Sequence, residues 1–196
     1  MLALRTPADD LKTVFGGLVF VWVCFIAQVV CFVFKSIDLA AWLGVMPRTP
    51  LGLVGIITAP LLHAGWDHLI ANSIALGILC YLARRTAPEG MSSAIFYAMI
   101  CGGALAWLTG EPGRPHIGAS GVAFGLIGFL LVNGLVRGGC GPILVTLVVG
   151  FLFGGAVLTV LKTTSNEGIS LSWQMHAGGM VGGVIAAWTS RERKRD

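Results

Sequence analysis

Four polar side chains could carry chemistry in an otherwise apolar sequence: Ser120, His176, His68 and Asn72. A serine hydroxyl becomes a strong nucleophile when a base removes its proton, and histidine is the usual base. His68 and Asn72 are four residues apart, so on a helix they share one face, and both can donate hydrogen bonds to one oxyanion. These residue types predict acyl-transfer chemistry with Ser120 as the nucleophile and His176 as the base.

The residues around Ser120 suit this chemistry. Small residues in the stretch Gly118-Ala119-Ser120-Gly121 allow a tight turn and a close approach of a substrate backbone. The Ser120 amide would begin a helix and could donate to the oxyanion. Phe124 is four residues further on, so its ring could stack on His176. The nearby acidic residues lie at a helix end or in outer loops (Asp67, Glu111 and Glu167), so we expect a Ser–His dyad rather than a triad.

The elements that must position these residues are membrane-spanning helices. Of the 196 residues, 56% are hydrophobic and 11% charged, with a mean hydropathy of +0.85, whereas a soluble domain carries about 25% charged residues. The apolar residues form long runs, which in hydrocarbon must be helical, and do not alternate as in a membrane barrel. We therefore expect an all-α polytopic membrane protein, a compact six-helix bundle forming one domain over residues 1–196. The six predicted spans are roughly residues 13–34, 66–82, 92–109, 120–136, 142–161 and 175–189.

The candidate residues are predicted to share one depth in the membrane. Seventeen residues separate Ser120 from Arg137, sixteen separate His68 from Arg84, and fifteen separate His176 from Arg191. At 1.5 Å per residue, all three lie about 22–26 Å above the cytoplasmic boundary, just below the outer surface. The stretch before Ser120 must then enter the membrane without being helical, which is tolerated only against protein or a water-filled cavity.

Glycines and basic residues indicate how the helices pack and which way they point. Gly121-x3-Gly125 and Gly179-x3-Gly183 supply small faces on which the Ser120 and His176 helices can approach closely. With six spans, nine Lys and Arg residues fall on one side and four on the other, so both termini should be cytoplasmic. The basic run Arg191–Arg195 would anchor the last helix at anionic lipids, and a net charge of +4 does not indicate nucleic-acid binding.

The connection from Lys35 to Gly65 is long and apolar for a loop between adjacent helices. We expect it to lie in the outer interface as short amphipathic pieces, interrupted by Pro47, Pro50 and Pro60. The five cysteines form no CxxC pair and are expected to be small core residues.

At these residues the sequence resembles the rhomboid family of intramembrane serine proteases. The matching motifs are His63-Ala-Gly-Trp-Asp-His68-Leu-Ile-Ala-Asn72, Gly118-Ala-Ser120-Gly121 and His176-Ala-Gly-Gly179-Met-Val-Gly-Gly183, in this order between roughly Leu61 and Ala187. Each motif alone is weak, but their combination is specific. The first outer loop lacks the Trp-Arg pair of many members and reads Val54-Gly55, and Met175 stands where alanine commonly precedes the final histidine.

The resemblance implies Ser120 as nucleophile, His176 as general base, and an oxyanion hole of His68, Asn72 and the Ser120 amide. It also implies that Phe124 packs on the catalytic histidine. The family cleaves transmembrane segments of other proteins near the outer face, without metal or cofactor. We accordingly expect transmembrane protein substrates and membrane lipids as partners, in the plasma (inner) membrane of a prokaryote.

Each candidate residue also has a structural interpretation. Ser120 alone could be a packing residue, and His68 and Asn72 alone could bond across helices for roughly 0.6 kcal/mol each. His176 alone would more often be structural or a proton relay, and only the common depth and order of the four favour catalysis. His63 would orient a loop, and His116 would hydrogen-bond near the cavity mouth. A zinc site of His63, His68 and His176 is disfavoured, because HxxxxH does not place both ligands on one helical face.

Two other classes of function remain open from the sequence. A catalytically inactive rhomboid-like protein would bind membrane clients, which the intact set of four residues argues against. A small transporter would carry its polar residues near the midplane and show an inverted repeat, and neither feature is seen here.

Overall fold

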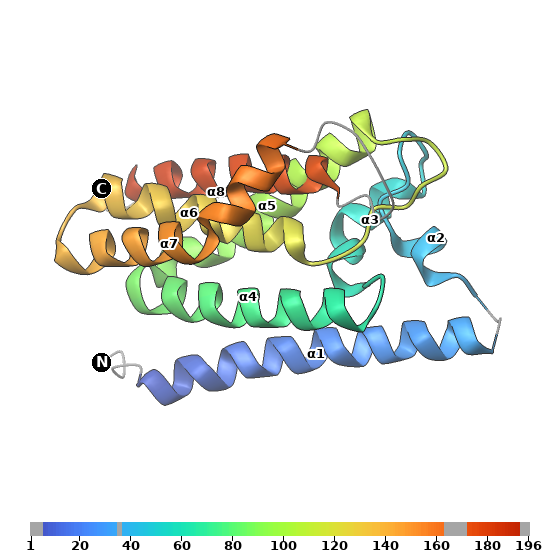
Figure 1. The fold of residues 1–196 in the computed structure, drawn as a ribbon, viewed down its shortest axis with the longest axis horizontal. Coiled ribbons are helices and arrows are strands. Elements are labelled where there is room, and N and C mark those ends of the chain that lie inside the picture. The colour runs from blue at the N-terminus through green and yellow to red at the C-terminus, as the bar shows by residue number, and fades with distance from the viewer. Residues whose placement is uncertain (1–5, 35–36, 163–171, 193–196) are drawn as a thin grey trace.

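The fold is that of a helical bundle, shown in Figure 1 as a computed structural model in which residues 6–34, 37–162 and 172–192 are described. The long helices run roughly parallel or antiparallel to one another, and the short elements α2 and α3 gather at one end. The elements are α1 (Pro7–Val33), α2 (Leu39–Leu43), α3 (Gly52–Thr58), η1 (Ala59–Leu61), α4 (Trp66–Thr86), α5 (Pro88–Thr109), α6 (Ser120–Arg137), α7 (Cys140–Lys162) and α8 (Trp173–Glu192).

The prediction of an all-helical membrane protein is confirmed. Within the described residues, five helices are long and apolar enough to cross a membrane: α1, α4, α5, α6 and α7. The sixth expected span, α8, has 20 residues but is less apolar, because it carries buried polar side chains such as Gln174, His176 and Ser190. These side chains face protein, which tolerates polar groups at membrane depth far better than lipid does.

Several helices extend beyond the apolar runs that predict them. Helix α1 begins at Pro7, because Thr6 and Asp9 form a capping box ahead of the apolar run. Helix α4 continues through Arg84 and Arg85 to Thr86. Polar residues can extend a helix beyond the hydrocarbon, so the length of an apolar run is the minimum length of its helix.

Helix α8 packs between α5 and α6, with glycines on two of its faces. A Cβ atom added to Gly179 or Gly183 would overlap a backbone carbonyl of α6, and one added to Gly182 would overlap the Tyr97 carbonyl of α5. The backbones are therefore closer than side chains would permit, which is how small residues allow membrane helices to pack. This packing fixes α8, and with it His176, against both neighbours.

The segment between α1 and α4 forms α2, α3 and η1, in agreement with the expected short pieces. It is attached to the end of α5, where Trp107 Nε1 donates to the Thr49 carbonyl at 2.8 Å and Arg48 Nη1 donates to the Leu108 carbonyl at 3.0 Å. The segment is thus anchored to the bundle without the Trp-Arg pair that the resemblance implies and that Val54-Gly55 replaces here.

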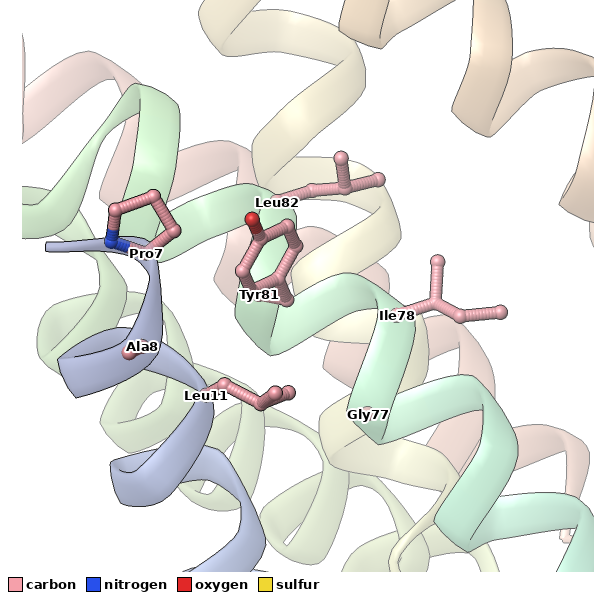
Figure 2. A pocket seen from close by; sticks show the side chains of 7 residues that line it. All are labelled: Pro7, Ala8, Leu11, Gly77, Ile78, Tyr81 and Leu82. Atoms are coloured by element: carbon pink, nitrogen blue, oxygen red, sulfur yellow. The ribbon is translucent and has the colours of Figure 1, made fainter.

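Helix α1 lies along α4 at the edge of the bundle (Figure 1). At one end, buried Asp10 pairs with Arg84 at 3.0 Å and with Arg85 at 3.2 Å. Further along, Trp22 Nε1 donates to Ser73 Oγ at 2.9 Å. Between the start of α1 and α4 lies an apolar hollow of about 430 Å³, whose lining residues are shown in Figure 2. It is lined by none of the four candidate chemical residues, and its apolar walls suit contact with lipid.

Candidate active site

The structure places Ser120 and His176 in direct contact. Ser120 is the first residue of α6, and His176 lies in the first turn of α8. His176 Nε2 lies 2.8 Å from Ser120 Oγ, within hydrogen-bonding distance. With Nε2 unprotonated, the hydroxyl donates to the ring, which is the arrangement a general base needs to take the serine proton.

The ring of His176 is held by its neighbours. Phe124 stacks on it with ring centroids 4.3 Å apart and an interplanar angle of 16°. Gly121 lies against Met175, where a Cβ atom would come within 3.1 Å of the Met175 carbonyl oxygen. The glycine faces of α6 and α8 thus allow the two helix starts to meet closely enough for Ser120 to reach His176.

A cavity of about 960 Å³ opens at this contact. Ser120 and His68 both line it, together with the loop before α6 and the start of α8. Exposed charged side chains also contribute to its wall (Asp67, Glu111 and Arg114). Charged side chains in the wall allow such a cavity to hold water.

His68 lies beside the loop that leads to Ser120. Gly118 has φ +116°, and a Cβ atom at this position would overlap the His68 ring. Only glycine combines this backbone conformation with so close an approach. His68 Nε2 is buried and has no hydrogen-bond partner among the described residues, so it is available to a bound group.

Asn72 lies one turn further along α4 and is buried, with a relative exposure of 6%. Its side-chain nitrogen has no hydrogen-bond acceptor within the part of the chain that the structure describes. Asn72 does not itself line the cavity. A buried amide donor without a partner is costly, and an oxyanion bound next to His68 would supply the missing acceptor.

The stretch before Ser120 is non-helical, as expected, and is held by backbone hydrogen bonds. Val45 and His116 exchange two N–H···O bonds of 3.0 Å, and the Gly118 N–H donates to the Ala59 carbonyl at 2.9 Å. This stretch is therefore fixed to the segment between α1 and α4, and these bonds satisfy part of its polar backbone.

His63 is buried and lies outside the cavity wall. Its ring packs edge-on against His68, with centroids 5.2 Å apart, and against Phe25 of α1. Burial, followed by the nearby His68, lowers the pKa of His63 to about 4, so its ring is neutral at physiological pH. His63 is therefore placed to support His68 and not to reach a substrate.

Sequence reasoning missed two residues that hold this region. Gln28 of α1 donates from Nε2 to the His63 carbonyl and accepts from the His63 N–H, both at 3.0 Å. Ser172 contacts His116 at the cavity wall. A glutamine within an apolar run is itself a signal of function, and Ser172 precedes His176 by the same four residues that separate His116 from Ser120.

No group of three His, Cys, Asp or Glu side chains among residues 6–34, 37–162 and 172–192 could hold a metal ion. His63, His68 and His176 are accordingly not assembled as ligands. The chemistry that the described site can perform is proton transfer from Ser120 to His176 and hydrogen bonding to a developing negative charge.

Comparison with known proteins places the chain in a family. Residues 50–193 match the rhomboid domain, and the chain belongs to the rhomboid family. The match begins just before α3 and covers all helices from α4 to α8, whereas α1 precedes it.

Individual relatives are bacterial. An uncharacterized protein of Mycobacterium tuberculosis (strain H37Rv) is 43% identical over 159 residues, which cover 77% of this chain and 65% of that protein. The rhomboid protease GluP of Bacillus subtilis is 31% identical over 138 residues, covering 67% of this chain and 25% of that protein. The putative rhomboid protease YdcA of the same organism is 26% identical over 145 residues, covering 71% and 68%. The chain thus spans just under two thirds of the length of the mycobacterial relatives.

Proposed function

We propose that this protein is an intramembrane serine endopeptidase that cleaves transmembrane segments of other membrane proteins near the outer leaflet. The observation that carries the proposal is the 2.8 Å contact between Ser120 Oγ and His176 Nε2 at the wall of a large cavity. Family membership and the names of the two Bacillus relatives agree with it.

The reaction would proceed by acyl transfer. Ser120 Oγ attacks the scissile carbonyl carbon while its proton passes to His176 Nε2, and the carbonyl oxygen becomes an oxyanion. His68, Asn72 and the free N–H at the start of α6 would donate hydrogen bonds to that oxyanion. His176 then gives its proton to the leaving amine, and a water molecule from the cavity hydrolyses the acyl-enzyme with His176 again as the base.

The absence of an acidic partner is compatible with this mechanism. Within the described residues no carboxylate bonds to His176, and its orientation comes instead from Phe124 and the Ser120 contact. Stacking and close packing restrict the ring to one plane, which is the orienting role that the aspartate has in a triad.

We further propose that the protein lies in the plasma membrane of a bacterium with both termini in the cytoplasm, so that the site opens near the outer surface. Its partners would be single-span or multi-span membrane proteins and the surrounding lipids. The bacterial relatives and the basic residues predicted on the inner side support this orientation.

The first test is cleavage of a model single-span substrate co-expressed with the wild type, Ser120→Ala or His176→Ala. Removing either member of such a pair lowers kcat by about 10⁶-fold in a soluble serine protease, so both variants should yield no detectable product. Membrane insertion and thermal unfolding in detergent should match the wild type. Undiminished cleavage by either purified variant would exclude the dyad, and an inactive wild type would favour the client-binding alternative.

A further inference from the structure

A second histidine–serine contact joins the same two segments as the candidate dyad. His116 Nδ1 lies 2.6 Å from Ser172 Oγ, and Ser120 Oγ lies 2.8 Å from His176 Nε2. In each segment the two participating residues are four positions apart. The segment that leads into α6 and the start of α8 are therefore connected at two points. In one contact the histidine belongs to the α8 side, and in the other it belongs to the α6 side.

Ser172 is bonded to the first turn of α8 as well as to His116. Its Oγ accepts the Met175 N–H at 3.2 Å, and its carbonyl accepts the His176 N–H at 3.1 Å. Ser172 thus caps this helix, because it supplies acceptors for backbone N–H groups that would otherwise be unsatisfied. Any displacement of Ser172 moves the backbone from which His176 projects.

His116 is fixed from the other side. Its backbone pairs with Val45 through two hydrogen bonds of 3.0 Å, and Val45 is fully buried. The imidazole of His116 therefore extends from a rigid point toward Ser172. The contacts form a continuous connection from Val45, in the segment between α1 and α4, through His116 and Ser172 to the backbone of His176.

We propose that His116 is a positioning residue, which holds Ser172 and thereby sets the distance and orientation of His176 relative to Ser120. This role rests on the proposed protease function. The glycine faces fix the separation of α6 and α8, and the His116–Ser172 contact adds a restraint on the turn of backbone from which His176 projects. A displacement of about 1 Å at a reacting pair costs roughly 10²-fold in rate.

The contact geometry favours this role over a second nucleophile at Ser172. Ser172 Oγ already accepts the Met175 N–H, and a nucleophile would have to give up this cap. The other ring nitrogen of His116, Nε2, is buried without a hydrogen-bond partner among the described residues, and Nδ1 is already engaged by Ser172.

The test compares His116→Phe, which keeps a planar ring and removes the hydrogen bond, with Ser172→Ala and the double variant. The first readout is fluorophosphonate labelling of Ser120, which needs the dyad geometry and no transmembrane substrate. We expect His116→Phe to slow both labelling and substrate cleavage by about 10–10²-fold. The double variant should be no slower than Ser172→Ala, because both changes break one connection, and Ser172→Thr should restore most of the rate.

A matched control is Thr49→Ala, which removes another hydroxyl that accepts a backbone N–H, here within the segment between α1 and α4. Thr49 Oγ1 accepts the Gly52 N–H at 3.0 Å and donates to the Met46 carbonyl at 3.1 Å, so both of these bonds stay within that segment. Labelling by this variant should stay within about twofold of the wild type. A thermal unfolding curve of each variant in detergent excludes a general loss of folding, and Ser172→Ala keeps the test decisive if His116→Phe does not fold.

Three outcomes would overturn the positioning role. They are wild-type labelling by His116→Phe, independent effects that multiply in the double variant, or labelling of Ser172 in Ser120→Ala. Failure of the proposed function would look different, since the wild type itself would then neither cleave nor label at Ser120. In that case, hydrogen exchange still tests the connection, because the Met175 and His176 amides should exchange faster in His116→Phe than in Thr49→Ala.

Discussion

At the scale of single residues, the candidate site separates proton transfer from stabilisation of charge. Ser120 and His176 contact each other directly, whereas His68 and Asn72 offer nitrogens that have no partner among the described residues. Donors that have no partner in the resting protein are suited to a charge that exists only during the reaction, because a ground-state partner would compete with it. Substitutions in the Ser120–His176 pair and in the His68–Asn72 pair should therefore have different effects on serine labelling and on substrate cleavage.

Asn72→Ala should lower the rate of substrate cleavage and leave a reactive serine. One missing oxyanion donor typically lowers kcat by about 10²–10³, and His68 and the start of α6 would still hold part of the charge. Fluorophosphonate labelling should slow less than proteolysis, because that reagent is already strongly activated. His176→Ala provides the contrast, since labelling and cleavage should fail together without the base. Cleavage by Asn72→Ala at the wild-type rate would make Asn72 a helix-packing residue only.

At the scale of elements, the site depends on how closely α8 approaches α5 and α6. Gly179 and Gly183 face carbonyl groups of α6, and Gly178 and Gly182 face those of α5. The Ser120–His176 contact lies at the end of this packed seam, so the separation between the helix backbones sets the separation between the two side chains.

Gly183→Ala should push α6 and α8 apart, because its Cβ atom would overlap the Gly125 carbonyl. We expect a loss of about 1–3 kcal/mol in the free energy of unfolding, together with a fall in cleavage, although Gly183 lies two turns from His176. The matched control is Gly154→Ala on α7, where no atom lies within 4 Å of the added carbon. That variant should be unchanged or more stable by about 0.5–1 kcal/mol, since alanine favours helix. Unfolding in detergent measures both, and equal stabilities would contradict the packing argument.

At the scale of the whole molecule, one helix at the edge of the bundle precedes the residues that match the rhomboid domain. Helix α1 precedes the matched residues and contacts the bundle through Asp10, Trp22 and Gln28. Gln28 reaches the backbone of His63, whose ring supports His68. An edge helix outside the matched domain is therefore connected to the candidate oxyanion site through these contacts.

The topology gives a prediction at this scale. The start of α1 and the end of α8 lie at the same end of the bundle (Figure 1), and nine of the basic residues are predicted on that side against four on the other. Reporter fusions at residue 1 and residue 196 should both be active in the cytoplasm. If both reported from the outer side, the orientation and the outer location of Ser120 would be wrong.

The sequence by itself determined the class of the protein and the candidate chemistry. Long apolar runs can be satisfied only as helices in lipid, so the helical membrane fold followed from composition and spacing. Polar residues are costly inside such runs, so Ser120, His176 and the pair on α4 stand out by residue type and position alone. Helix ends were harder to predict from the sequence, because capping by Thr6 and Asp9 depends on local polar contacts beyond the apolar run.

The sequence predicted that Ser120 meets His176, but the distance between them and the contact of His116 with Ser172 came only from the tertiary structure. Ser120 and His176 are 56 positions apart, as are His116 and Ser172, and each pair is created by the packing of α6 against α8. The attachment of α1 to the loop before α4 depends in the same way on α1 lying along α4. Spacing along a helix fixes which residues share a face, but contacts between helices depend on their separation and rotation. These are set by the packing of glycines such as Gly183 against a neighbouring backbone.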